Sequence, residues 1–145
     1  MSWKTISVLA FLAAAACLTW LAFQGSILAT GPLAVAIQIA AGLLIVWARL
    51  TFGLRSFHAA ADPTAGDLVT RGPYHYLRHP IYASVLYALW AGVAAHWSPL
   101  HFLVAALATA LLGVRMFAEE QLLLHVYPEY AEYARHTSRV FPSLF

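Results

Sequence analysis

Two long stretches of the chain contain no charged side chain. Residues 5–48 and residues 79–114 are free of Asp, Glu, Lys and Arg. A helix that spans a membrane needs about 20 mostly apolar residues, so each stretch has room for two spans and a tight connection. Polar and turn-forming residues interrupt the stretches at residues 24–26 and 96–99. The pattern predicts four transmembrane helices, near residues 5–24, 31–49, 80–97 and 99–118.

The composition agrees with a membrane protein. Of the 145 residues, 62% are hydrophobic and only 10% are charged, whereas a soluble domain is about 25% charged. So apolar a chain is not intrinsically disordered, and its single cysteine, Cys17, excludes a disulfide framework. We therefore expect an all-α integral membrane bundle that forms one domain over residues 1–145.

Basic residues indicate the orientation of this bundle. Lys4 precedes the first expected helix, and no Lys or Arg occurs in the connections that follow the first and third helices. The other cations lie beside the connection between the second and third helices, or at and after the end of the fourth: Arg49, Arg55, Arg71, Arg78, Arg115, Arg135 and Arg139. Cytoplasmic loops carry the excess of Lys and Arg in membrane proteins. The sequence therefore predicts cytoplasmic termini in an inner membrane of the bacterial type, and the net charge of +2 indicates no nucleic-acid partner.

The ionisable residues concentrate in two segments on the expected cytoplasmic side, residues 50–80 and residues 115–145. These segments contain all six acidic residues of the chain: Asp62, Asp67, Glu119, Glu120, Glu129 and Glu132. Ionisable side chains beside a bilayer are costly unless they face water or a polar cavity. We therefore expect the functional site in these two segments.

In the first segment, prolines constrain a short loop ahead of the third helix. Gly72-Pro73 favours a turn, and Pro80 suits the first turn of a helix while it disfavours a helical His79. His75 and His79 have the spacing of metal ligands on a helix, but the flanking prolines argue against a helix and we expect no metal site. The polar side chains that this loop should hold at the membrane surface are Tyr74, Tyr76, Arg78 and His79.

In the second segment, charged residues mark the end of the fourth helix. Arg115 and Glu119 are four residues apart and can form an ion pair on a helix. The adjacent Glu120 indicates either a polar cavity or simply a helix end in water, and composition alone favours the helix end. The residues after Pro128 predict a short amphipathic helix that presents tyrosines on one face.

These two segments carry motifs that resemble a known family. Residues 68–82 read Leu-Val-Thr-Arg-Gly-Pro-Tyr-His-Tyr-Leu-Arg-His-Pro-Ile-Tyr. Residues 115–142 contain an arginine, two adjacent glutamates, a histidine, the paired tyrosines Tyr130 and Tyr133, an arginine and a proline. In this order, and after apolar helices, the motifs resemble the isoprenylcysteine carboxyl methyltransferase family and its phospholipid methyltransferase relatives. The resemblance covers residues 68–142, about half of the chain.

The resemblance implies an integral membrane enzyme that uses S-adenosylmethionine, bound between the two cytoplasmic segments and not by a Rossmann domain. It implies methylation of a lipophilic acceptor, isoprenylcysteine carboxylate or a related lipid, which reaches the site sideways from the membrane lipids. Carried onto this chain, the cofactor-binding positions are Tyr74, Tyr76, Arg78, His79, Pro80, Tyr82, Glu119, Glu120, His125 and Tyr130.

The chemistry of this cofactor assigns roles within the motifs. Arg78 or Arg135 suits its carboxylate, and tyrosine faces suit its adenine and its sulfonium cation. Glu119 or Glu120 suits its ammonium group. The methyl group is already activated, so the enzyme mainly needs to exclude water and align the nucleophile. A carboxylate acceptor needs only a positioning arginine, for which Arg135 is the first candidate, whereas an amine acceptor needs a base such as Glu120 or His79. The catalytic candidates are Arg135, Glu120 and Arg78.

Two other functions remain open. Sterol reductases resemble this family in their C-terminal half and use NADPH, but they usually have longer chains with more helices. A non-enzymatic bundle, such as a haem protein, would need histidine pairs within the spans. His96 and His101 instead lie in or beside an outer connection. The sequence does not indicate an oligomeric state.

Overall fold

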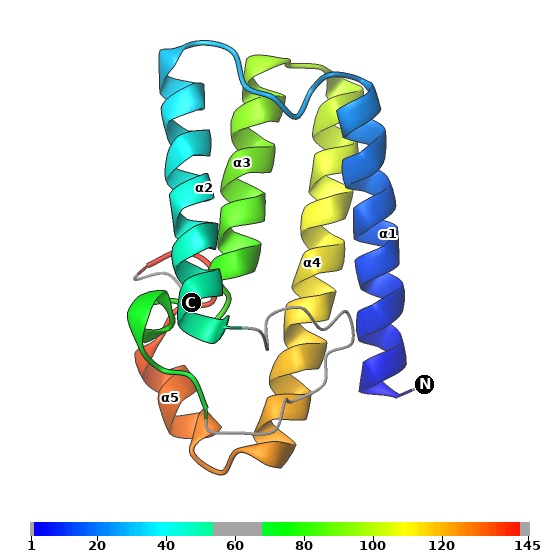
Figure 1. The fold of residues 1–145 in the computed structure, drawn as a ribbon. Coiled ribbons are helices and arrows are strands. Elements are labelled where there is room, and N and C mark those ends of the chain that lie inside the picture. Colours follow the sequence, from blue (N-terminus) through cyan, green and yellow to red (C-terminus); the bar gives the residue numbers. More distant parts are fainter. Residues whose placement is uncertain (1, 54–67, 143–145) are drawn as a thin grey trace.

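The computed structural model of the protein describes residues 2–53 and 68–142, which form a helical bundle (Figure 1). Among these residues there is no strand, only one isolated parallel bridge between Leu77 and Ser138. The elements follow in the order α1 (Trp3–Phe23), α2 (Pro32–Phe52), the short 3-10 helix η2 (Gly72–His75), α3 (Pro80–Ala95), α4 (Pro99–Val126) and α5 (Tyr130–His136).

The all-helical fold and its four apolar helices confirm the prediction from the hydrophobic pattern. α1, α2 and α4 are each long and apolar enough to cross a membrane, and α3, with 16 residues, is a shorter apolar helix. The fourth span was expected to end near residue 118, but α4 continues to Val126, since no proline interrupts it before Pro128. Three charged residues of the first polar segment lie outside the described residues: Arg55, Asp62 and Asp67.

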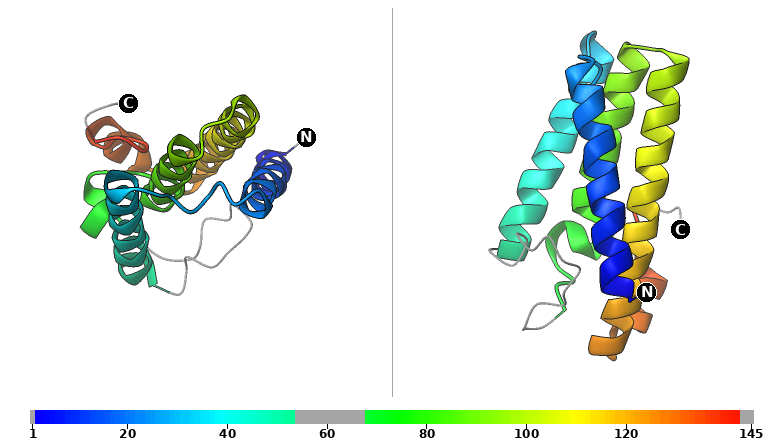
Figure 2. Two further views of the ribbon diagram at one scale, coloured as in Figure 1. Left: turned by 90° about the horizontal axis from the view of Figure 1, so that it is seen from above. Right: turned by 90° about the vertical axis from the view of Figure 1, so that its right-hand side faces the viewer.

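The helices pack as two main pairs, α1 with α4 and α2 with α3. Seen along the bundle, α2, α3 and α4 follow one another, with α1 beside α4 (Figure 2). The buried side chains of α1 and α4 include several small ones: Ala10, Ala14, Ala105 and Ala108. Small residues let helices approach closely in lipid, where burial of large apolar groups brings little gain. Many large apolar side chains accordingly stay on the outside of the bundle.

A polar side chain within α2 ties the connection after α1 to the bundle. The side-chain amide of Gln38 donates to the carbonyl oxygens of Ile27 at 2.6 Å and Ala88 at 2.9 Å. It also accepts a hydrogen bond from the Ala29 N–H at 3.0 Å. The same connection packs closely against Gly92. A Cβ added at this position would lie only 2.2 Å from the Ile27 carbonyl oxygen. Gln38 thus pairs backbone groups that would be costly to leave unpaired in an apolar setting.

After α5, residues 137–142 run back beside the start of α3, and we refer to them as the return segment. The Arg78 N–H donates to the Ser138 carbonyl at 2.7 Å, and the His79 N–H donates to the Arg139 carbonyl at 3.0 Å. These bonds hold residues of the two polar segments side by side, although the segments are far apart in the sequence.

Candidate functional site

The two polar segments meet at Glu120, whose side chain is buried near the end of α4. One carboxylate oxygen, Oε1, accepts a hydrogen bond from Arg78 Nε at 3.1 Å and lies 3.2 Å from His79 Nε2. The other, Oε2, accepts from Arg139 Nη2 at 2.9 Å. A single carboxylate therefore joins the loop before α3, the end of α4 and the return segment. We refer to Arg78, His79, Glu120 and Arg139 as the Glu120 cluster.

The length of α4 places this cluster at the depth of a membrane surface. An α-helix rises about 1.5 Å per residue, so Glu120 lies about 30 Å along the helix from Pro99. This distance is roughly the thickness of the hydrocarbon core of a bilayer. Figure 1 shows the last turns of α4 extending beyond the N-terminal end of α1. The polar cluster thus lies where the apolar part of the bundle ends.

Arg78 is a cross-link within the fold as well as a charge at the site. Only 7% of its side chain is exposed. Its Nη1 donates to the carbonyl oxygens of Ala134 and Thr137, at the C-terminal end of α5. Cations are favoured at such an end, because the last carbonyls of a helix lack partners within it. Arg78 therefore fixes α5 and the return segment against Glu120.

Glu119 forms a second network, which reaches α1. Its Oε1 lies 2.9 Å from Arg115 Nε and accepts a hydrogen bond from the Tyr82 hydroxyl at 2.6 Å. The Arg115 side chain is 5% exposed, and its guanidinium group lies 4.5 Å from the centre of the Phe11 ring. The ion pair expected between Arg115 and Glu119 is confirmed. Because Arg115 and Glu120 are buried, the alternative of a helix end in water is wrong.

His79 lies between the two carboxylates. Its Nε2 is 3.2 Å from Glu120 Oε1, and its Nδ1 is 3.8 Å from Glu119 Oε2. The side chain is 6% exposed, and its ring packs 5.6 Å from the ring of Tyr82. Its ring therefore links the carboxylates of the two adjacent glutamates of α4.

Tyr130 presents a buried hydroxyl group without a partner. The residue is 2% exposed, and its hydroxyl oxygen makes no hydrogen bond with the residues that the structure describes. Burial, and then the nearby Glu120 carboxylate, raise the pKa of Tyr130 above its ordinary range, so the phenol is neutral. Buried polar atoms nearly always have a partner in protein, water or ligand. The Tyr130 hydroxyl therefore has a hydrogen-bonding capacity that the described residues leave unused.

The other motif residues around the loop differ in exposure. Tyr74 is buried, with its ring 5.4 Å from that of Phe52, and its carbonyl oxygen accepts a hydrogen bond from the Tyr133 hydroxyl at 2.6 Å. Burial raises the pKa of Tyr133 to about 12. Pro80 is buried in the first turn of α3, whereas Tyr76 is 60% exposed. The loop is thus locked to α5 through Tyr74, and Tyr76 remains accessible from outside.

Arg135 and His125, two of the residues expected at the site, lie on the exposed surface outside the Glu120 cluster. Arg135 is exposed and pairs with Glu132, also exposed, at 2.9 Å. His125 is exposed as well. The structure instead brings Arg139 into the cluster. In the sequence, Arg139 stands out only as one of the basic residues on the expected cytoplasmic side. The available signal was an arginine between the paired tyrosines and the final proline, but Arg135 and Arg139 both fit it.

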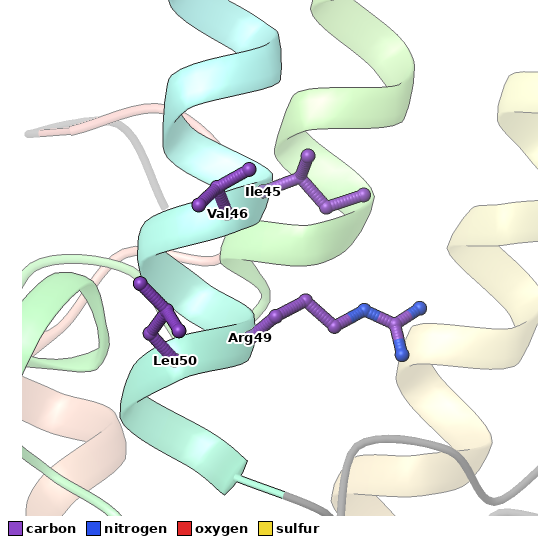
Figure 3. A pocket seen from close by; sticks show the side chains of 4 residues that line it. All are labelled: Ile45, Val46, Arg49 and Leu50. Carbon is purple, nitrogen blue, oxygen red and sulfur yellow. The ribbon is translucent and has the colours of Figure 1, made fainter.

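A pocket on α2 is separate from these residues. It is lined by Ile45, Val46, Arg49 and Leu50. Figure 3 shows Ile45 and Arg49 extending to the right of α2, whereas Val46 and Leu50 lie in front of the helix. All four side chains come from one helix, so the pocket is a surface feature of α2, and no residue of the Glu120 cluster lines it.

The sequence model of the phospholipid methyltransferase family matches residues 26–130. The chain belongs to this family. The match confirms the resemblance seen in the two motifs, and it includes Arg78, His79, Glu119 and Glu120. Arg139 and the rest of the return segment lie beyond the family match.

Two bacterial relatives match about half of the chain. The cobalt-zinc-cadmium resistance protein CzcN of Cupriavidus metallidurans is 41% identical over 78 residues, which are 53% of this chain and 36% of that protein. The nickel-cobalt-cadmium resistance protein NccN of Alcaligenes xylosoxydans xylosoxydans is 37% identical over 79 residues, which are 54% of this chain and 37% of that protein. The match therefore spans little more than a third of the length of these relatives. No solved structure matches the chain.

Proposed function

We propose that this protein transfers a methyl group from S-adenosylmethionine to a lipophilic acceptor at the cytoplasmic surface of a membrane. Membership of the phospholipid methyltransferase family supports methyl transfer. Three helices that can cross a membrane support an acceptor drawn from lipid. The observation that carries the proposal is the convergence of motif residues from two distant segments on the buried Glu120 carboxylate.

The residues around Glu120 suit the chemistry of S-adenosylmethionine. When bound, this cofactor supplies a methyl group that is already activated on a sulfonium cation. The carboxylates of Glu119 and Glu120 offer negative charge for its cationic groups, and the unpartnered Tyr130 hydroxyl offers a hydrogen bond for its amino-acid end or its ribose. The proposed cofactor contacts are Tyr74, Tyr76, Arg78, His79, Pro80, Tyr82, Glu119, Glu120, His125 and Tyr130.

Methyl transfer from this donor depends mainly on alignment and on exclusion of water. We assign this task to Arg78 and Glu120, which fix the loop, α4 and α5 relative to one another around the reacting groups. Arg135, on the exposed side of α5, remains a candidate for positioning the acceptor. Its pairing with Glu132 must then give way to the acceptor.

The nature of the acceptor decides whether a base is needed. A carboxylate acceptor, such as isoprenylcysteine carboxylate, is nucleophilic without loss of a proton. An amine acceptor must lose one, and we assign this proton to His79, whose ring nitrogens lie 3.2 Å from Glu120 Oε1 and 3.8 Å from Glu119 Oε2. The acceptor reaches the cluster sideways from the bilayer in both cases.

Binding of cofactors tests the proposal against the alternative of an NADPH-dependent reductase, which the family match disfavours. Purified protein is titrated by calorimetry with S-adenosylmethionine, S-adenosylhomocysteine and NADPH. We expect both sulfur compounds to bind, and the Arg78→Ala variant to bind them at least about tenfold more weakly, since a charged hydrogen-bonding group is lost. Binding of NADPH alone would overturn the proposal.

A further inference from the structure

Among the described residues of the site, Arg139 carries the guanidinium group that is most open to the surroundings. Its side chain is 44% exposed, compared with 7% for Arg78 and 5% for Arg115. The two other arginines are enclosed by the fold. Of the three arginines that contact Glu119 or Glu120, Arg139 is therefore the one that a ligand outside the protein reaches most easily.

One edge of this group is already held by Glu120. Arg139 Nε donates to both carboxylate oxygens at 3.1 Å, and Nη2 donates to Oε2 at 2.9 Å. Nη1 makes no hydrogen bond with the part of the chain that the structure describes. The backbone is held as well, because the His79 N–H donates to the Arg139 carbonyl. An arginine fixed in this way loses little conformational freedom when it binds a further anion.

The charges of the site leave room for such an anion. Three guanidinium groups, those of Arg78, Arg115 and Arg139, face the two carboxylates of Glu119 and Glu120. Among these five groups the cations outnumber the anions by one. Charges interact more strongly where neighbouring groups are shielded from water, so an anion at the outer edge of Arg139 balances the cluster.

The residues that follow Arg139 lie on the apolar surface of α3. Val140 packs against the core cluster that contains Leu86. Phe141 is 48% exposed, and its ring lies 5.4 Å from the ring of Tyr87. Leu86 and Tyr87 are about two turns into α3, on its way into the membrane. An anionic group at Arg139 therefore has an apolar surface beside it, as the head group of an amphiphile requires.

We infer that the outer edge of Arg139 binds the anionic group, a carboxylate or a phosphate, of the lipophilic acceptor. The inference rests on the proposed methyl transfer and names the contact that selects the acceptor. The apolar chain of the acceptor lies along Val140 and Phe141, and its head group lies at the Glu120 cluster. Arg139 is then the specificity-determining arginine in place of Arg135.

Matched amphiphiles test this site in the absence of cofactor. Purified protein in a neutral detergent is mixed with dodecanoate, dodecyl phosphate or the uncharged dodecanol, and its thermal unfolding is followed. We expect the anionic amphiphiles to raise the unfolding midpoint of the wild type by about 2–4 °C near saturation, because they bind the folded state, and dodecanol to leave it unchanged. Arg139→Gln should abolish this rise. The matched control Arg71→Gln alters an exposed arginine of the loop before α3 and should retain it.

Further variants and ligands identify the bound group and show whether a lost response results from misfolding. Arg139→Lys keeps the charge but not the paired contact with Glu120, and should show a smaller rise than the wild type. A rise with only one of the two anionic amphiphiles identifies the acceptor as a carboxylate or as a phosphate. An equal rise with inorganic phosphate, an undiminished rise in Arg139→Gln, or loss of the rise in Arg135→Gln alone would overturn the inference.

Calorimetry with S-adenosylhomocysteine on the same preparations reports on methyl transfer separately. If this ligand binds the wild type while the amphiphile response does not depend on Arg139, the anion site is refuted and the proposed function stands. If this ligand fails to bind, the proposed function is refuted, whatever the amphiphiles do.

Discussion

At the scale of single residues, Tyr130 and Tyr133 offer a comparison within one short helix. Both are largely buried, but the Tyr133 hydroxyl donates to the Tyr74 carbonyl, whereas the Tyr130 hydroxyl has no partner among the described residues. Removal of one hydroxyl therefore costs the fold a hydrogen bond, and removal of the other costs it none. The pair separates a role in ligand binding from a role in stability.

We expect Tyr130→Phe to raise the KM for S-adenosylmethionine by about 5–10-fold with no loss of stability, because a neutral hydrogen bond is worth about 1 kcal/mol. Tyr133→Phe should instead lower the free energy of unfolding by about 1 kcal/mol, through the lost bond to Tyr74. Initial-rate kinetics and thermal unfolding of both variants measure the two effects. A Tyr130→Phe protein with unchanged KM would show that the hydroxyl does not face the cofactor.

Arg78 is another residue whose geometry gives a sharp expectation. Its guanidinium group contacts Glu120 with Nε and the carbonyl oxygens of Ala134 and Thr137 with Nη1. A lysine keeps the charge but cannot reach both sets of partners, because its ammonium is a single point on a flexible stem. The role of Arg78 therefore depends on its shape as well as its charge.

We accordingly expect Arg78→Lys to reduce kcat/KM at least about tenfold, which corresponds to about 1.4 kcal/mol of transition-state stabilisation. Arg71→Lys makes the same change at an exposed arginine of the same loop and should leave kcat/KM unchanged. Initial rates measured on membranes with equal contents of each variant compare the two kcat/KM values. Equal activity of the two variants would mean that Arg78 contributes charge alone.

At the scale of elements, the hydrophobic pattern was sufficient to predict the helices. The long stretches without charge predicted the number of helices. Prolines indicated where three of them start, since Pro32, Pro80 and Pro99 each begin a helix. The pattern placed the end of the fourth helix too early. Charged residues such as Glu119 end an apolar stretch, but they do not end a helix.

The partners within the site could be predicted only in part. The Arg115–Glu119 ion pair follows from helical spacing, because both residues lie on one element. The place of Arg139 does not, because it depends on the return segment lying beside the loop before α3. Arg135 and Arg139 are only four residues apart, but Arg135 is exposed and Arg139 contacts Glu120. Their spacing in the sequence does not reveal which of the two reaches the cluster.

The connection after α1 gives a prediction about packing between elements. A Cβ at Gly92 would lie 2.2 Å from the Ile27 carbonyl oxygen, so we expect Gly92→Ala to lower stability by about 1–3 kcal/mol through overpacking. Gly113 in α4 has open space around its Cβ position. Gly113→Ala should therefore be neutral or slightly stabilising, since glycine is unfavourable within a helix. Thermal unfolding of the two variants measures the difference, and equal midpoints would contradict the packing described for the connection.

At the scale of the whole molecule, the proposed function requires the Glu120 cluster to face the cytoplasm, where S-adenosylmethionine is made. In a Cys17→Ser background, we expect Thr30→Cys, in the connection after α1, to react with a membrane-impermeant maleimide in intact cells. Glu129→Cys, at the start of α5, should react only after the cells are opened. Both positions are exposed in the structure. The reverse pattern of labelling would place the cluster on the outer side and contradict the orientation inferred from the basic residues.

The central claim is transfer of a methyl group to a lipophilic acceptor at a site built on Glu120. Its most direct test is incubation of membranes that contain the protein with S-adenosylmethionine labelled in the methyl group, followed by extraction into organic solvent. Membranes with equal amounts of Glu120→Gln serve as the test variant, and Glu129→Gln makes the same change at an exposed glutamate as control. We expect label in the organic phase with the wild type and with Glu129→Gln, and at most about a hundredth of it with Glu120→Gln, because a buried charge that contacts three partners is lost. No label above background with the wild type, or equal label with Glu120→Gln, would contradict the account.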